Sequence, residues 1–275
     1  MAGDWRWDET LYRGSAAYYG LGRLPYPAEV ADALADALGL DGTQRLLDVG
    51  CGPGSLTLLV AARVAEAVGI DADPGMIAAA RVAAERAGVR NAEWRHMRAE
   101  ELPAGLGRFA VATFAQSLHW LDLTRVAAAV RDMLEPGGAL VHVQATTHRG
   151  DCSEDPLEHP RPPYEEIDAL VRSYLGPVRR AGRGLRSTRD DEADVLRAAG
   201  FTGPTRTEPD TARVVIRTAD DIVAATFSLS SSTPHLFGAD VGRFEADLRA
   251  LLRGVAPDDA FSERTRPVAL DIWRA

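Results

Sequence analysis

The stretch that most constrains the fold lies at residues 45–57, which have the sequence RLLDVGCGPGSLT. Residues 46–49, apolar apart from one acid, are typical of a parallel strand that is covered on both faces. Three glycines follow at alternate positions, namely Gly50, Gly52 and Gly54. Glycine tolerates positive φ and has no Cβ, so a bound molecule can approach the backbone closely. The pattern predicts a strand, a ligand-binding turn, and a helix that Ser55 or Thr57 caps.

Two classes of ligand use a turn of this kind. A dinucleotide site has the pattern G-x-G-x-x-G, but position 55, where its third glycine would fall, is a serine. The order found here, Asp48-x-Gly50-x-Gly52-x-Gly54, resembles the first motif of the class I S-adenosylmethionine-dependent methyltransferases. The resemblance implies that the amino acid end of the cofactor is held by Asp48, Gly50, Cys51, Gly52 and Gly54. The turn by itself leaves both classes open.

A second acid ends the next predicted strand. Residues 68–71 form a short apolar run that ends at Asp71. Pro74 then opens a helix that extends to about Arg86, with Asp73 as its cap. A carboxylate at this strand tip can accept hydrogen bonds from the vicinal hydroxyls of a ribose, which NAD and S-adenosylmethionine both carry. Alternatively, Asp71 caps the following turn. The resemblance adds two cofactor contacts, Ala72 and Met76.

The third strand is expected at residues 92–96, and the segment 97–103 is similar to the family segment that meets the adenine. The family usually carries an acid where Arg98 stands. The adenine contact is therefore expected from the backbone of Ala99 or from Glu100. The alternative is that Glu100 and the acid after it begin a solvated helix.

The fourth strand is expected at residues 109–115, and it continues into residues 116–120. Ligands of an open parallel sheet bind outside the carboxyl ends of its strands, so Gln116 is expected to contact the cofactor. The Leu-His-Trp triplet that ends this segment resembles a methyltransferase branch that includes small-molecule and trans-aconitate methylating enzymes. His119, with an ordinary pKa of about 6.5, is the candidate base or substrate orienter, and Trp120 is a candidate substrate contact. Alternatively, His119 packs beneath the cofactor and Trp120 fills a gap.

A helix at 126–134, a Pro-Gly-Gly turn and a strand at 140–143 extend the resemblance over about residues 45–145. It implies an α/β fold, with a doubly wound, Rossmann-like, mainly parallel sheet of seven strands, an N-terminal helical lid and an inserted helical cap. The expected parts are a lid and helix at 1–44, a cofactor-binding core at 45–145, and the rest of the sheet at 146–275, with cap insertions at about 150–188 and 218–262.

Aromatic residues crowd the first 26 positions, as Trp5, Trp7, Tyr12, Tyr18, Tyr19 and Tyr26. A helix is expected from about Pro27 to Leu38. The aromatic segment either closes over the site as a lid, which the resemblance favours, or anchors the N-terminus against the sheet. As parts of a lid, Tyr18 and Tyr19 are candidate substrate contacts.

The chain beyond residue 145 carries less specific signals. Helices are expected at about 164–174, 190–199, 219–226 and 244–253, and strands at 211–217 and 267–273. Seven arginines lie between Arg161 and Arg189, either as a solvated surface or as a site for an anionic substrate. The serine-rich residues 228–235 are either a flexible connector or, with His235, part of a substrate pocket.

Composition narrows the chemistry further. All 31 basic residues are arginine, which excludes a Schiff-base lysine and a P-loop lysine. The formal net charge of −9 disfavours nucleic-acid binding and favours a small-molecule substrate. Cys51 and Cys152 form neither a disulfide framework nor a metal-ligand pattern, so two free thiols and no metal are expected. The sequence has neither a long apolar run nor a signal peptide, which predicts a cytoplasmic monomer or homodimer without membrane contact.

The resemblance implies methyl transfer from S-adenosylmethionine to a small-molecule acceptor, with S-adenosylhomocysteine as product, and leaves open whether oxygen, nitrogen or carbon is methylated. The lack of lysine indicates GC-rich coding and, by association, a role in specialised metabolism. Three alternatives stay open. They are an S-adenosylmethionine-binding cyclase or rearrangement enzyme that moves no methyl group, an NAD-type oxidoreductase, and a catalytically idle binding module.

Overall fold

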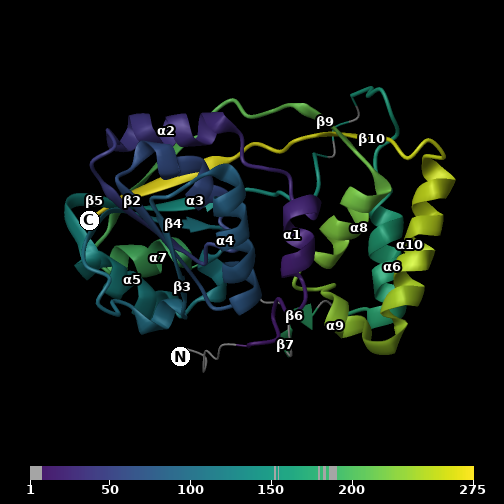
Figure 1. Ribbon diagram of the computed structural model, residues 1–275, viewed down its shortest axis with the longest axis horizontal. Helices are drawn as coiled ribbons and strands as arrows, with labels where there is room; N and C mark the ends of the chain where they lie inside the picture. The colour runs from purple at the N-terminus through teal and green to yellow at the C-terminus, as the bar shows by residue number, and fades with distance from the viewer. Residues whose placement is uncertain (1–7, 152, 154, 179, 182–183, 186–190) are drawn as a thin grey trace.

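A mainly parallel sheet forms the centre of the computed structural model, which describes residues 8–151, 153, 155–178, 180–181, 184–185 and 191–275 (Figure 1). The sheet has seven strands in the order β3-β2-β1-β4-β5-β11-β8. These strands are β1 (Arg45–Val49), β2 (Glu66–Asp71), β3 (Ala92–His96), β4 (Phe109–Ala115), β5 (Leu134–Gln144), β8 (Thr202–Thr207) and β11 (Ala269–Arg274). Strands β1 to β5 run parallel, and β11 is antiparallel to its neighbours β5 and β8. The expected seven-stranded, mainly parallel sheet is confirmed.

Helices cover both faces of this sheet. One face carries α2 (Ala28–Leu38) and α3 (Ser55–Val60), and the other carries α5 (Leu123–Met133) and α7 (Glu192–Ala198). Adjacent residues of β1 show the reason, because side chains of a strand alternate between its faces. Leu46 packs with the α2 side and Leu47 with the α5 side, and both are buried. The doubly wound arrangement follows from this alternation. The remaining helix of the body, α4 (Pro74–Ala87), packs against Trp94 of β3.

A second group of helices lies beside the sheet and has a core of its own. It consists of α6 (Tyr164–Leu175), α8 (Ala219–Phe227), α9 (Pro234–Phe237) and α10 (Val241–Val255) (Figure 1). Its buried aromatic residues include Phe227, Phe237 and Phe244, and the last two rings stack with centroids 4.1 Å apart. These helices, together with the antiparallel ribbon of β9 (Val214–Arg217) and β10 (Phe261–Arg264), are called the cap below. A further two-stranded ribbon joins β6 (Arg180–Ala181) and β7 (Gly184–Leu185).

Helix α1 (Ala16–Gly22) lies between the sheet body and the cap (Figure 1). It packs so closely on α8 that a Cβ on Gly22 would lie 2.3 Å from the backbone of Ala224. A buried ion pair fixes this junction, with Arg217 Nη1 3.0 Å from Glu263 Oε2. Arg217 also donates to the carbonyl of Gly22, and Glu263 accepts from the hydroxyl of Tyr164. One charged pair thus ties α1, α6 and the β9–β10 ribbon together.

The local capping predictions have mixed outcomes. Asp73 accepts from the backbone N–H groups of Gly75 and Met76 and caps α4, as expected. The expected side-chain cap of the helix after the glycine turn is wrong. Gly54 occupies the N-cap of α3 with no side-chain cap bond, because the hydroxyl of Thr57 donates to a buried carboxylate instead.

Two strands differ from expectation. The Pro-Gly-Gly segment does not precede β5 but lies within it, looped out, since Phe109 pairs with Leu134 while Val111 pairs with Ala139. The sequence did not predict β8, which begins Thr-Gly-Pro and therefore resembles a turn. The strand expected at 211–217 begins at Val214 and belongs to the cap ribbon, not to the sheet.

Two predictions from composition meet partial tests. Cys51 is a buried free thiol, and burial raises its pKa well above the ordinary value. Cys152 lies outside the described residues. Within the described part of the chain, no helix is both long enough and apolar enough to cross a membrane.

Candidate active site

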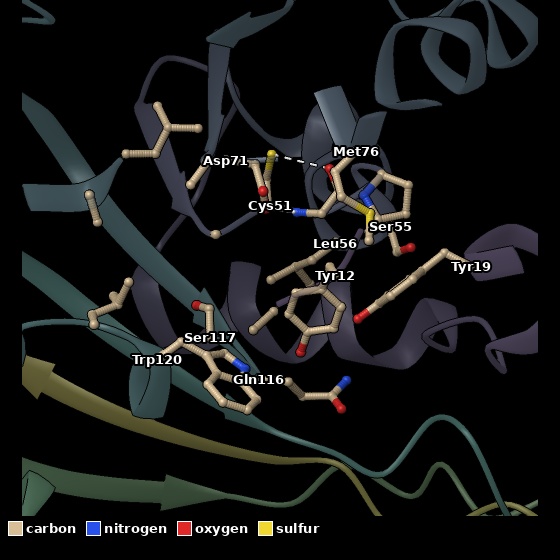
Figure 2. A pocket seen from close by; sticks show the side chains of 18 of the residues that line it. Tyr12, Tyr19, Cys51, Ser55, Leu56, Asp71, Met76, Gln116, Ser117 and Trp120 are labelled. Atoms are coloured by element: carbon tan, nitrogen blue, oxygen red, sulfur yellow. Dashed lines mark hydrogen bonds between the residues drawn. The ribbon is translucent and has the colours of Figure 1, made fainter. Parts of the chain in front are cut away.

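A pocket opens at the carboxyl ends of β1, β2 and β4, where an open parallel sheet binds its ligands (Figure 2). The strand side of its lining consists of Gly50–Pro53, Ser55, Leu56, Ile70–Ala72, Met76, Met97–Glu100, Ala115–Ser117, Trp120, Leu121 and Thr147. The N-terminal segment supplies Leu11, Tyr12, Tyr19, Arg23, Leu24 and Tyr26. The pocket therefore joins the predicted cofactor motifs to the aromatic N-terminal segment.

The glycines of the turn serve two different purposes. Gly52 lines the pocket at a φ of 56°, and a Cβ there would meet nothing within 4 Å, so its backbone faces open space. Gly54 has a φ of 83°, and its Cβ would lie 2.4 Å from Cη2 of Trp94. Gly54 is not among the residues that line the pocket, so the structure places this predicted contact against a ring of β3 instead. Gly50 and Cys51 do line the pocket, as does Gly52.

Asp71 joins the tips of two neighbouring strands. Its Oδ2 accepts from the backbone N–H of Gly52 at 2.8 Å, and its Oδ1 accepts from that of Asp73 at 2.8 Å. The second bond is the turn-capping role that was the alternative to a ribose contact. Each carboxylate oxygen has two acceptor sites, so Asp71 keeps capacity for a ligand's hydroxyls while it holds both turns. Burial raises the pKa of Asp71 to about 6.

Asp48 lies behind the turn and not in the pocket. Its side chain is fully buried, with Oδ2 accepting from the Thr57 hydroxyl at 2.5 Å and Oδ1 from the Thr113 hydroxyl at 2.9 Å. Burial raises the pKa of Asp48 to about 6, although the two hydroxyl donors favour the charged form. The expectation that Asp48 touches the cofactor is corrected, because Asp48 belongs to the inward-facing side of β1. It positions the turn by linking α3 to β4.

The predicted adenine segment lines the pocket, and the two acids in it differ. Glu100 is buried and its Oε1 accepts from the backbone N–H of Asp122 at 3.0 Å, which contradicts a solvated helix start at this position. Glu101 is exposed and pairs with Arg98 at 3.1 Å. Ala99, with Glu100 and Glu101, forms a single 3-10 turn. Ala72 and Met76 also line this pocket, as the resemblance implied.

The segment after β4 brings Gln116 and Trp120 to the pocket but not His119. Gln116 adopts a φ of 57°, unusual for a residue with a side chain, and its Nε2 donates to the Tyr26 hydroxyl at 2.8 Å. Backbone strain of this kind is concentrated at functional sites. His119 is half-buried, with its ring centroid 4.6 Å from that of Trp120. Its role as base or orienter stays a prediction.

Neighbouring tyrosines of α1 have different environments. Tyr19 lines the pocket, whereas Tyr18 packs on Phe227 in the cap, with ring centroids 5.0 Å apart. Consecutive helical residues point about 100° apart, so one helix cannot direct both side chains to the same site. The predicted substrate contact of Tyr18 is corrected accordingly. Tyr12 lies between Tyr19 and Trp120, at 6.2 and 6.0 Å from their ring centroids, in edge-on contacts (Figure 2). Trp5 and Trp7, also predicted for this segment, lie outside the described residues.

The serine-rich segment is a compact buried turn, not a flexible connector. Ser228 and Ser232 are buried and donate to carbonyls of α8, namely those of Ala225 and Thr226. His235 lies outside the cofactor pocket, where its Nδ1 is 2.8 Å from Thr233 Oγ1. The substrate contact predicted for His235 is therefore not placed at this pocket.

The sequence did not single out Arg23, Ser117 or Thr147 as pocket residues. Arg23 Nε donates to Ser228 Oγ at 2.7 Å, and its guanidinium lies 4.6 Å over the ring of Tyr19. These contacts join residues about two hundred positions apart, and no local pattern announces them. For Arg23, the one available signal was its position next to the aromatic cluster.

Comparison with known proteins agrees with this geometry. Residues 46–138 match the family model described as a methyltransferase domain, and this range contains the glycine turn, Asp71 and the segments after β3 and β4. The chain carries a class I S-adenosylmethionine-dependent methyltransferase domain. The dinucleotide alternative for the glycine turn is thereby set aside.

The methyltransferase domain is similar to a curated relative and to solved structures. It is 40% identical over 98 residues to a ubiquinone biosynthesis O-methyltransferase of Cereibacter sphaeroides, which covers 35% of this chain and 39% of the relative. The chain thus matches about two fifths of that relative's length.

Two solved structures share the fold over nearly the whole chain. The [4+2]-cyclase SpnF has a TM-score of 0.54 and 21% identity, over 97% of this chain and 93% of that one. The N-methyltransferase NodS of Bradyrhizobium japonicum, solved with S-adenosylhomocysteine, has a TM-score of 0.51 and 14% identity, over 96% and 98%. At these identities the likeness concerns the fold.

Proposed function

We propose that this methyltransferase domain transfers a methyl group from S-adenosylmethionine to a small-molecule acceptor. The observation that carries the proposal is the bond between Asp71 and the backbone of Gly52. It brings a carboxylate and an open glycine backbone together on one wall of the pocket, at the tips of two adjacent parallel strands. A nucleoside with an amino acid tail needs both features within one site.

The residues present fit this cofactor. The remaining acceptor sites of Asp71 suit the vicinal hydroxyls of the ribose, and the apolar side chains of Met76 and Met97 suit the faces of the adenine ring. The open space beside Gly52 admits the chain of the amino acid end. When bound, the cofactor supplies an activated methyl group that leaves by in-line displacement.

The chain's own contribution is to orient the reactants and exclude water. Tyr12, Tyr19 and Trp120 form an aromatic wall on the N-terminal side of the pocket, and burial raises the pKa of Tyr12 far above its ordinary value. Tyr12 therefore stays neutral, and the wall it forms supports displacement in a dry site. We further propose that His119, packed on Trp120, takes up the acceptor's proton or orients the acceptor.

Binding is the first test. The protein is expected to bind S-adenosylhomocysteine in isothermal titration calorimetry and to show no saturable binding of NADH. Saturation by NADH without affinity for S-adenosylhomocysteine would contradict the proposal.

Incubation with methyl-labelled cofactor and candidate metabolites is the second test, with transfer of the label expected. Conversion of a substrate without movement of the label would identify a cyclase or rearrangement enzyme. Tight cofactor binding with no conversion of any substrate would identify an idle binding module. A role in specialised metabolism, a cytoplasmic location and a monomeric or homodimeric state belong to the same proposal.

A further inference from the structure

A second cavity, of about 370 Å³, lies inside the cap. Helix α6 and the residues after it form one side, and α8, the serine-rich turn and α9 form the other. Residues 148–149, which follow β5, contribute one end. None of the described residues lines both this cavity and the cofactor pocket. The two are separate sites.

The cavity combines an apolar body with a charged end. Its apolar lining includes Ile167, Val171 and Leu175 of α6, and Leu229 and Leu236 opposite them. Its charged lining consists of Arg149, Asp168 and Arg172. Two guanidinium groups face one carboxylate, so the charged end has a positive balance.

Arg149 is the feature that points to a ligand. Its Nε is buried and has no hydrogen-bond partner among the described residues. Its Nη1 lies 3.9 Å from Asp168 Oδ2, beyond hydrogen-bonding distance, and its guanidinium lies 5.9 Å from the ring centroid of Tyr164. The hydroxyl of Tyr164 donates to Glu263 at 2.7 Å, so the ring beneath the guanidinium is held in place. A buried donor without a partner costs free energy, which a bound acceptor would recover.

The chemistry of the two ends selects one class of ligand. A guanidinium presents parallel N–H donors that match the two oxygens of a carboxylate. The apolar lining matches a hydrocarbon chain or ring. We propose that the cap cavity binds a carboxylic acid with an apolar body, its carboxylate on Arg149 and its body between α6 and the serine-rich turn. This assignment goes beyond methyl transfer and stands on the cap's own residues.

A thin partition separates this acid from the cofactor pocket. Arg23, which lines the cofactor pocket, donates to the carbonyl and hydroxyl of Ser228, at 2.9 and 2.7 Å. The residues on either side of Ser228, namely Thr226 and Leu229, line the cap cavity. The acid is thus held one layer of side chains away from the cofactor.

Calorimetric titration with octanoate, octan-1-ol and octylamine tests the assignment, because the three probes share one chain and differ in the head group. We expect octanoate to bind the wild-type protein about tenfold or more tightly than octan-1-ol, and Arg149→Gln to remove that preference. Arg125→Gln is the matched control, since Arg125 is an exposed arginine of α5 outside both sites. Val171→Trp fills the apolar end while keeping Arg149, and it is expected to abolish octanoate binding.

The outcomes separate cleanly. Absence of octanoate binding, equal affinity for the acid and the alcohol, or an unchanged preference in Arg149→Gln would each overturn the assignment. Tighter binding of octylamine than of octanoate would make Asp168 the anchor and overturn the class of ligand. Binding of S-adenosylhomocysteine is measured in parallel, so failure of the cap assignment and failure of the proposed methyl transfer are told apart.

Discussion

The cofactor pocket and the cap are built from different parts of the chain's chemistry. The floor of the pocket consists largely of backbone at the tips of adjacent strands, where Gly52 and Asp71 meet. The cap is assembled from side chains that are distant in sequence, such as Arg217, Glu263 and Tyr164. A floor made of backbone leaves a compact sequence pattern, whereas an assembly of distant side chains leaves none. The first therefore identifies the family, and the second determines what distinguishes this chain.

The largest effect is expected where the cap depends on a single charged pair. Arg217→Met leaves the carboxylate of Glu263 buried without its partner, because both side chains are almost fully buried. Removing one member of such a pair typically costs about 3 to 5 kcal/mol of the free energy of unfolding. Urea unfolding followed by circular dichroism measures this loss.

The matched control is Arg63→Met, because Arg63 pairs with Asp32 at the surface, where both side chains are about half exposed. A loss below about 1 kcal/mol is expected for it. Equal losses in the two variants would show that the buried pair does not hold the cap.

Two glycines two positions apart test the floor itself. Gly54→Ala should lose about 2 to 4 kcal/mol of the free energy of unfolding, from the left-handed backbone and from the contact with Trp94. Gly52→Ala should lose about 1 to 2 kcal/mol from the backbone alone. Its Cβ would enter the open space of the pocket, so its affinity for S-adenosylhomocysteine should fall as well. Normal affinity in Gly52→Ala would contradict a close approach of the cofactor to this backbone.

The same contrast explains which features could be predicted from the sequence. The first four strands of the sheet were predicted to within two residues of their bounds, because apolar runs and turn residues are local signals. Strand β8 was missed because Thr202, Gly203 and Pro204 have the composition of a turn, and only pairing with β11 makes them a strand. Burial in tertiary structure overrode local propensity there.

Within the site, residue type was easier to predict than direction. Asp48 and Asp71 were both recognised as acids at strand tips, yet only Asp71 lines the pocket. The side chain of Asp48 is directed to hydroxyls on α3 and β4, a direction that depends on the packing of three elements. Arg23 was not recognised, because its partner Ser228 lies far away in the sequence.

The two acids therefore provide the next test. Asp71→Asn should weaken binding of S-adenosylhomocysteine by about 1.5 to 3 kcal/mol, the usual contribution of hydrogen bonds to a charged group. Asp48→Asn should change that affinity much less, since Asp48 does not line the pocket. Calorimetric titration of both variants makes the comparison, and equal losses would return Asp48 to the list of cofactor contacts.

The smallest effect concerns the pH dependence of Asp48. Burial raises its pKa from an ordinary 3.8 to about 6, so between these values the folded protein binds the proton more tightly than the unfolded chain does. The free energy of unfolding should therefore rise at this site as pH falls from about 7 to about 5, by about 1 kcal/mol. Asp48→Asn has no proton to gain there. Its stability relative to the wild type should fall by that amount over the same pH range, as measured by urea unfolding.

Asp71 serves as the internal control for this titration, because its pKa is also raised to about 6 and it remains in both proteins. Its contribution cancels in the difference between wild type and Asp48→Asn. A difference that does not change with pH would mean that Asp48 titrates normally in the folded protein. In that case the hydroxyls of Thr57 and Thr113 would fully compensate the burial of its charge.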